Sequence, residues 1–235
     1  MSDLLPIRRE SLSEQAYRQL REALMRGGFK PGQRLVLRSL ARELGISATP
    51  VREALFRLVS EQALSLDERG SVLVPVLDRE RFAEIRDLRL ELEGRGAFRA
   101  AELADEAGIE ELAAIHERMR QAKAAGDTAA TLLENERFHF KLCALARLPV
   151  LYRIVESLWM QSGPLLNRLY EMPAATPPDR HEHLAVLAGL RDGDGAAARA
   201  AIQRDIADNG RLLIELLPHA EAADTMIESA CNERD

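Results

Sequence analysis

Cysteines and long apolar runs are scarce in this sequence. The two cysteines, Cys143 and Cys231, are too few and too far apart for a disulfide framework or a zinc ribbon. No stretch approaches the roughly 20 apolar residues of a membrane span, and no signal peptide is visible after Met1. These absences argue against a membrane-spanning protein and a disulfide-stabilised secreted protein, and we expect a protein of the reducing cytoplasm.

Aromatic residues are also few, at 4% of the chain, whereas Ala, Leu, Glu and Arg are abundant, which favours helix over strand. The net charge of −6 would disfavour binding to DNA if it were spread evenly. Residues 1–77, however, contain 12 Lys and Arg against 9 Asp and Glu, whereas residues 78–235 contain 20 against 29. Because salt screens charges beyond about 10 Å, this division predicts a DNA-binding head (1–77) on an acidic body (78–235).

The segment 38–58 predicts two short helices joined by a tight turn. Gly45 can adopt a positive φ and end the first helix. Thr49 and Pro50 are expected as N-cap and first residue of the second helix. That helix has an apolar stripe with arginines outside it (Val51, Ala54, Leu55 and Leu58 against Arg52 and Arg57). Two helices around a short Gly-containing turn, the second one basic, predict a helix-turn-helix that reads the major groove.

The flanking segments complete this predicted DNA-binding domain. A helix over 11–27 precedes the motif, and two β-type runs, 64–66 and 72–74, follow it around a Gly-bearing turn. A helix-turn-helix followed by such a hairpin is a winged helix, here with the wing tip near Arg69 and Gly70. We therefore expect the head to be a winged helix-turn-helix domain of three helices plus a β-hairpin wing.

The head closely resembles the GntR family of bacterial transcription regulators over about residues 11–75. The resemblance rests on Arg-Gly-Gly-Phe-Lys-Pro-Gly-Gln-Arg-Leu, on Leu-Ala-Arg-Glu-Leu-Gly-Ile-Ser-Ala-Thr-Pro-Val-Arg-Glu-Ala-Leu and on the wing glycine. It implies contacts to bases or phosphates (Arg38, Arg52), to the DNA backbone (Ser47, Thr49) and from the wing to the minor groove (Arg69, Gly70). Ala48 stands where the family usually has Arg, which removes a guanine contact of about 1–3 kcal/mol. The competing interpretation is that Arg38 and Arg52 are solvated surface residues of a generic three-helix domain.

The body is expected to be an all-α bundle of about six helices, which makes the protein mainly α. Glycine and proline breaks divide it into 80–106, 109–125, 129–147, 150–171, 178–192 and 196–217. A loose tail is expected over 218–235.

Polar residues interrupt the apolar stripes of three of these helices. Asn135 and His139 lie one turn apart on one face, and Asp205 sits in the middle of another, where a carboxylate needs a cation or a donor. If 193–195 turns an antiparallel hairpin, His183 and Asp205 lie level across it. Two imidazoles, a carboxylate and an amide oxygen would suit zinc, nickel or manganese. A hydrogen-bonded His–Asp pair in the core is the alternative.

The body also resembles the FCD domain, the all-helical effector module of the same family, over about residues 80–217. The resemblance rests on Arg89-Leu-Glu-Leu-Glu-Gly and Phe138-His139. It implies a metal held by an Asp, a His four residues later and two further His; here these positions are Asn135, His139, His183 and Asp205. Arg89 resembles the arginine that can receive an effector carboxylate, and a structural Arg paired with a nearby acid is the alternative. His116 and His219 are expected at the surface, and His181 is expected to face away from the site.

These observations predict a one-component transcription regulator. It would bind an inverted-repeat DNA operator as a homodimer and sense a small organic acid through a divalent metal. A metal-dependent hydrolase-like body is a different class, but no clear general base accompanies the predicted site, so we do not expect an enzyme. A purely architectural DNA-binding dimer is the third interpretation.

Overall fold

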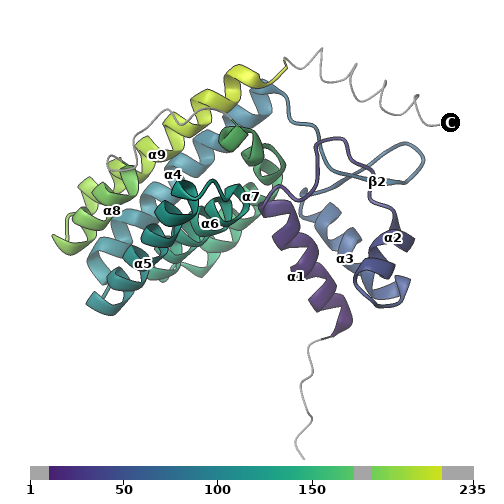
Figure 1. The fold of residues 1–235 in the computed structure, drawn as a ribbon, viewed down its shortest axis with the longest axis horizontal. Helices are drawn as coiled ribbons and strands as arrows, with labels where there is room; N and C mark the ends of the chain where they lie inside the picture. Colours follow the sequence, from purple (N-terminus) through teal and green to yellow (C-terminus); the bar gives the residue numbers. More distant parts are fainter. Residues whose placement is uncertain (1–10, 172–180, 219–235) are drawn as a thin grey trace, which may run out of the picture.

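The computed structural model describes residues 11–171 and 181–218 of the 235-residue chain. Within these ranges, nine helices and one two-stranded antiparallel sheet form the fold (Figure 1). The elements are α1 (Leu12–Met25), α2 (Leu37–Glu43), α3 (Ala48–Ser60), β1 (Ser65–Leu66), β2 (Val72–Leu73), α4 (Arg79–Leu103), α5 (Glu106–Ala124), α6 (Thr128–Leu145), α7 (Pro149–Glu171), α8 (Glu182–Arg191) and α9 (Gly195–Leu216). The predicted mainly α fold, with a winged helix-turn-helix followed by a helical bundle, is confirmed.

The head contains the predicted turn, but the second helix of the motif begins earlier than expected. Gly45 ends the turn region after α2 with φ = +67°. Helix α3 begins at Ala48 with Ser47 as its N-cap, so the prediction that Thr49 is the N-cap was wrong. Pro50 occupies the third helical position, where its missing N–H is still one of the four that have no partner within the helix.

The wing is a short hairpin that follows α3. Ser65 pairs with Leu73 and Leu66 with Val72, and an isolated bridge joins Arg34 to Leu73. Gly70 has φ = +75°, and Asp67 accepts the backbone N–H groups of Arg69 and Ser71. The side chain of Asp67 therefore stabilises the turn at the tip of the wing.

The body is built on two long antiparallel helices, α4 and α9 (Figure 1). The start of α4 lies beside the end of α9, where the backbone N–H of Arg79 donates to the carbonyl oxygen of Pro218. Gly108 was expected to separate two helices, but it lies within the first turn of α5, because Asp105 caps that helix by accepting the Gly108 N–H. The predicted start of α8 at 178 and the predicted tail from 219 onward lie outside the described residues. No helix in the described ranges combines the length and the apolar character needed to cross a membrane.

The head is packed directly onto the body, where α1 lies against α7 (Figure 1). Two ion pairs cross this contact, Arg21–Glu156 and Arg26–Glu136. One continuous hydrophobic core contains residues of both parts, including Leu24 of the head and Trp159 of the body. The orientation of the head is therefore set by packing and not only by the linker before α4.

Gly163 of α7 lies close against the backbone at the end of α1. A Cβ added there would lie 2.2 Å from the Leu24 carbonyl oxygen and 2.8 Å from the Met25 Cα, neither of which can rotate away. We expect Gly163→Ala to destabilise the protein by about 1–3 kcal/mol, the usual range for overpacking, measured by thermal unfolding. Gly96→Ala is the matched control, because its Cβ would meet side-chain atoms no closer than 3.6 Å. Equal stability of the two variants would contradict the α1–α7 contact.

Candidate functional site

The predicted DNA-contacting residues all lie at the surface of the head. Helix α2 carries one of them, the start of α3 three, and the wing two; all are exposed (Arg38, Ser47, Thr49, Arg52, Arg69 and Gly70). Within the described residues, the side chains of Arg38 and Arg52 form no ion pair and no hydrogen bond. Their guanidinium groups are thus available for phosphates or base edges.

Arg57 lies on the same helix as Arg52, but its side chain contacts other residues of the head. Its guanidinium pairs with Glu14 at 2.8 Å and with Glu61 at 3.1 Å, and it covers the ring of Tyr17 at 3.6 Å from the ring centroid. Arg57 therefore stabilises the α1–α3 contact, whereas Arg52 faces solvent.

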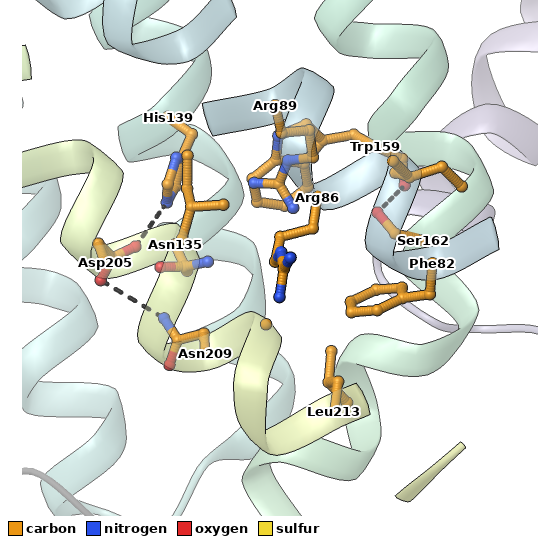
Figure 2. A pocket seen from close by; sticks show the side chains of 13 residues that line it. Phe82, Arg86, Arg89, Asn135, His139, Trp159, Ser162, Asp205, Asn209 and Leu213 are labelled. Carbon is orange, nitrogen blue, oxygen red and sulfur yellow. Dashed lines mark hydrogen bonds and ion pairs between the residues drawn. The ribbon is translucent and has the colours of Figure 1, made fainter. Parts of the chain in front are cut away.

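A small cavity of about 30 Å³ lies in the body, lined by α4, α6, α7 and α9. Figure 2 shows Asn135, His139 and Asp205 on one side of it, with Arg86 and Arg89 projecting from α4 beside them. The sequence had placed Arg89 and these three candidate ligands at one site, and the structure brings all four to the same cavity.

Glu93 anchors the inner wall of this site and is only 1% exposed. Its carboxylate accepts hydrogen bonds from Arg89 Nε at 2.6 Å and from Trp159 Nε1 at 3.0 Å, and it lies 2.6 Å from His139 Nδ1. Burial opposes the charged form, but Arg89 and His139 outweigh it and lower the pKa of Glu93 to about 2. Arg89 is thus paired with a nearby acid, as expected if its role is structural. It also lines the cavity, and its guanidinium covers the Trp159 ring.

His139 lies between two carboxylates. Nδ1 contacts Glu93, and Nε2 lies 3.3 Å from Asp205 Oδ2. Burial alone would lower the pKa of His139, but the two carboxylates raise it to about 9. A carboxylate on Nδ1 fixes the ring and directs Nε2 outward, as in the carboxylate–histidine–metal arrangement of metalloproteins.

His183 and Asp205 lie level across the α8–α9 hairpin, as expected from their equal distance from the turn. His183 Nε2 is 3.9 Å from Asp205 Oδ2, and the fully buried His183 ring stacks on Phe138 at 3.6 Å. Burial, together with neighbouring His181 and His139, holds the pKa of His183 well below its usual value, so the ring is neutral near pH 7.

The residues present fit a divalent metal ion. Ligand atoms of His139, His183 and Asp205 all lie within 4.8 Å of one another. Both ring nitrogens of His183 and Oδ2 of Asp205 are buried without a hydrogen bond in the described part of the chain. Two imidazoles and one carboxylate are a common ligand set for zinc, and half-buried Asn135 lies at the same cavity.

Two histidines that were expected elsewhere lie beside this cluster. His116 is only 5% exposed, so its predicted surface position was wrong; it follows Leu112 by four residues on the apolar face of α5, a signal that the sequence contained. His181 was expected to face away, but its Nδ1 lies 3.8 Å from Asp205 Oδ1. His181 is the N-cap of α8, and its side chain accepts the His183 N–H. Because an N-cap residue does not have helical backbone angles, helical spacing does not predict where its side chain points. His219 lies outside the described residues.

Comparison with known proteins identifies both parts of the chain. Residues 12–74 match the bacterial regulatory proteins of the gntR family, and residues 84–208 match the FCD domain. The chain belongs to the GntR family. The HTH-type transcriptional regulator McbR of Escherichia coli is 34% identical to this GntR regulator over 87% of this chain and 94% of that protein.

Other relatives and solved structures agree with this assignment. The gluconate operon transcriptional repressor of Bacillus subtilis is 31% identical over 63% of this chain and 59% of that protein. The structure of E. coli McbR/YncC superposes with a TM-score of 0.81 at 32% identity, covering 88% of this chain and 99% of that one. A putative GntR regulator from Rhodococcus has the same fold, with a TM-score of 0.71 at 20% identity over 88% and 99% of the two chains. The chain is thus a DNA-binding transcription regulator with an FCD domain, and its relatives are regulators rather than enzymes.

Proposed function

We propose that this GntR regulator senses a small carboxylic acid through a divalent metal held in the FCD domain, and binds an inverted-repeat operator in the cytoplasm as a homodimer. The observation that carries the proposal is the buried cluster of His139, His183 and Asp205. Both ring nitrogens of His183 and Oδ2 of Asp205 have no hydrogen bond within the described residues, and His139 and Asp205 line a cavity together with Arg86 and Arg89. We place the boundary between the two domains at residues 77 and 78, since Asp78 is the N-cap of α4.

The metal would be held by His139, His183 and Asp205, with the Asn135 amide oxygen as a further ligand. Zinc, nickel and manganese all accept such donors, and the bound ion would supply a Lewis-acidic centre for carboxylate oxygens. Glu93 orients His139, while Arg86 and Arg89 of α4 place positive charge where the far end of an acid would lie. The Arg89 fork is suited to a carboxylate because it can donate two parallel hydrogen bonds.

The small size of the cavity links acid binding to a change of structure. At about 30 Å³ it is much smaller than the roughly 300–1,000 Å³ of a typical small-molecule site. An organic acid would therefore require the lining side chains to move. Trp159 and Ser162 line the cavity from α7, and Gly163 of the same helix touches α1 of the head. Widening the cavity would thus displace α7, the helix against which α1 of the head packs. The effector changes DNA affinity only as far as it prefers one arrangement of the heads over another.

Operator recognition would fall to Arg38, Arg52 and the wing. Ser47 and Thr49 would contact the DNA backbone, and Arg69 and Gly70 would approach the minor groove. A pair of heads related by two-fold symmetry reads half-sites about one helical turn apart, which supports the expectation of a homodimer. Because Ala48 provides no guanine contact, the half-site sequence would depend chiefly on the two arginines and the wing.

Metal content tests the proposed site. Protein purified without chelator should contain nearly one divalent metal ion per chain, measured by elemental analysis. The double variant His139→Ala/His183→Ala should contain almost none, because it removes both imidazole ligands. Asn209→Ala is the control, since Asn209 contacts Asp205 Oδ1 at 3.4 Å without being a candidate ligand. Metal-free wild-type protein, prepared without chelator and still unable to take up added zinc, would overturn the proposal.

Acid binding can be followed through the single tryptophan of the chain, Trp159, which lines the cavity. We expect one or more acids from a panel of mono-, di- and tricarboxylates to change Trp159 fluorescence saturably. Arg89→Lys should weaken this binding by about 10-fold, since Lys keeps the charge beside Glu93 but lacks the bidentate fork. Operator affinity without acid should change much less. An unaltered titration would remove Arg89 from the acid site, and no response to any acid would favour a purely architectural role.

A further inference from the structure

Three histidines from two segments converge beside the cluster of His139, His183 and Asp205. His116 comes from α5, His181 caps α8, and His183 lies in its first turn. Their ring centroids are 4.2 to 5.7 Å apart, and one ligand atom of each lies within 4.8 Å of the others. His183 is thus common to this group and to the group that includes His139 and Asp205.

The buried nitrogen atoms that lack partners are concentrated in this group. Nδ1 of His116 and both ring nitrogens of His183 have no hydrogen bond in the described ranges. By contrast, both nitrogens of His139 face a carboxylate, at 2.6 and 3.3 Å. A buried polar atom without a partner is destabilising, because it has lost its hydrogen bonds to water. A cation among the three imidazoles would be bound by nitrogen atoms that have no partner within the described residues, whereas both nitrogens of His139 already face a carboxylate.

Negative charge is available at the edge of the group. Asp205 Oδ1 lies 3.8 Å from His181 Nδ1, so a cation beside the three rings would lie close to a carboxylate. The His181 ring is held in place because its Nδ1 accepts the His183 N–H at 3.3 Å. The His183 ring is held by stacking on Phe138. Preorganised rings of this kind lose little freedom when they bind a metal.

We propose that His116, His181 and His183 form a second site, of three imidazoles, for a divalent metal ion of the zinc class. Three neutral imidazoles with one open position are an established ligand set for zinc. The inference builds on the metal-sensing function proposed above, since His183 belongs to both sets. Because His183 Nε2 faces Asp205, the two sets compete for this residue and for one ion. The ion therefore has two alternative positions, both of which use His183.

The test compares ligand counts and affinities in the full-length protein stripped with chelator and reloaded with Zn²⁺ or Co²⁺. We expect X-ray absorption of the zinc-loaded protein to show close to three imidazoles per ion, whereas the first set alone supplies two. His116→Ala should weaken Zn²⁺ binding by more than about 100-fold, beyond the usual loss caused by an outer-shell residue. Met119→Ala is the matched control, because Met119 is buried one turn from His116 on the same face of α5 and is not expected to bind the ion.

Two further variants separate this inference from the proposed function. Asp205→Asn keeps the shape of the first set but removes its charge, and should retain Zn²⁺ binding; addition of His116→Ala should then abolish it. If His116→Ala leaves affinity and imidazole count unchanged while Asp205→Asn loses the metal, the second site is refuted and the first set stands. If the reverse holds, His116 and not Asp205 carries the metal. Wild-type protein that takes up neither ion would overturn both. Circular dichroism of each variant checks that the fold is retained.

Discussion

Arg52→Ala is expected to abolish specific operator binding while leaving the helical circular dichroism signal unchanged. Arg52 is exposed on the first half of α3 and has no partner among the described residues, so its removal disturbs no packing. The loss of a bidentate base contact costs about 1–3 kcal/mol per head. In a dimer this loss occurs twice, which corresponds to a large fall in affinity, measurable by footprinting or by fluorescence anisotropy with labelled operator DNA.

Arg57→Ala provides the control for this experiment, because Arg57 lies on the same helix but is bound by Glu14, Glu61 and Tyr17. Its removal should lower the thermal stability of the head and leave operator affinity close to that of wild type well below the unfolding temperature. A retained footprint for Arg52→Ala, or equal loss of affinity in the two variants, would refute the assignment of Arg52 to the DNA.

Glu93→Ala is expected to reduce the free energy of unfolding more than any other substitution considered for the body. Glu93 is the shared partner of Arg89, His139 and Trp159 in the interior. Its removal leaves the buried Arg89 without its acidic partner and His139 with Asp205 as its one remaining carboxylate, which costs about 3–5 kcal/mol. For a chain of this length, each kcal/mol lowers Tm by about 2–4 °C. Calorimetry or chemical denaturation of the chelator-treated protein measures the effect.

Glu117→Ala is a suitable comparison for Glu93→Ala. Glu117 also pairs with an arginine of its own helix, Arg120 at 2.7 Å, but both side chains are about half exposed. Such surface pairs contribute little to stability, because solvent screens the two charges. Glu93→Gln should fall between the two, since the amide still accepts hydrogen bonds but no longer neutralises the cations. Similar stabilities for Glu93→Ala and Glu117→Ala would contradict the role assigned to Glu93.

The head could be predicted from the sequence because its signals are local. A turn glycine, an apolar stripe and a Gly-bearing hairpin each act over a few residues, and Gly45 and Gly70 have the positive φ values that such turns need. The start of α3 was misplaced by two residues because Ser47 and Thr49 are both suitable N-caps, and the sequence does not say which the chain uses. This error changed the start of one helix but not the number or order of the elements.

The candidate metal cluster was predictable only in part. His183 and Asp205 could be paired by counting outward from the hairpin turn, because the helices on either side of a tight turn run antiparallel. His116 comes from a third helix, and its position depends on how α5 packs against α8, which no short-range pattern specifies. The role of Glu93 was likewise hidden, although its spacing of four residues from Arg89 predicts an ion pair on one helix face.

The contact between head and body was not predictable, because Gly163 matters only through a carbonyl oxygen of α1 more than a hundred positions earlier. The single core that spans this contact also has an evolutionary consequence. A recombinant that exchanged the head of one family member for that of another would join an unrelated α1 to this α7, with mismatched partners for Glu136 and Glu156. We therefore expect new operator specificity to arise more readily by substitution on α3 than by exchange of whole heads.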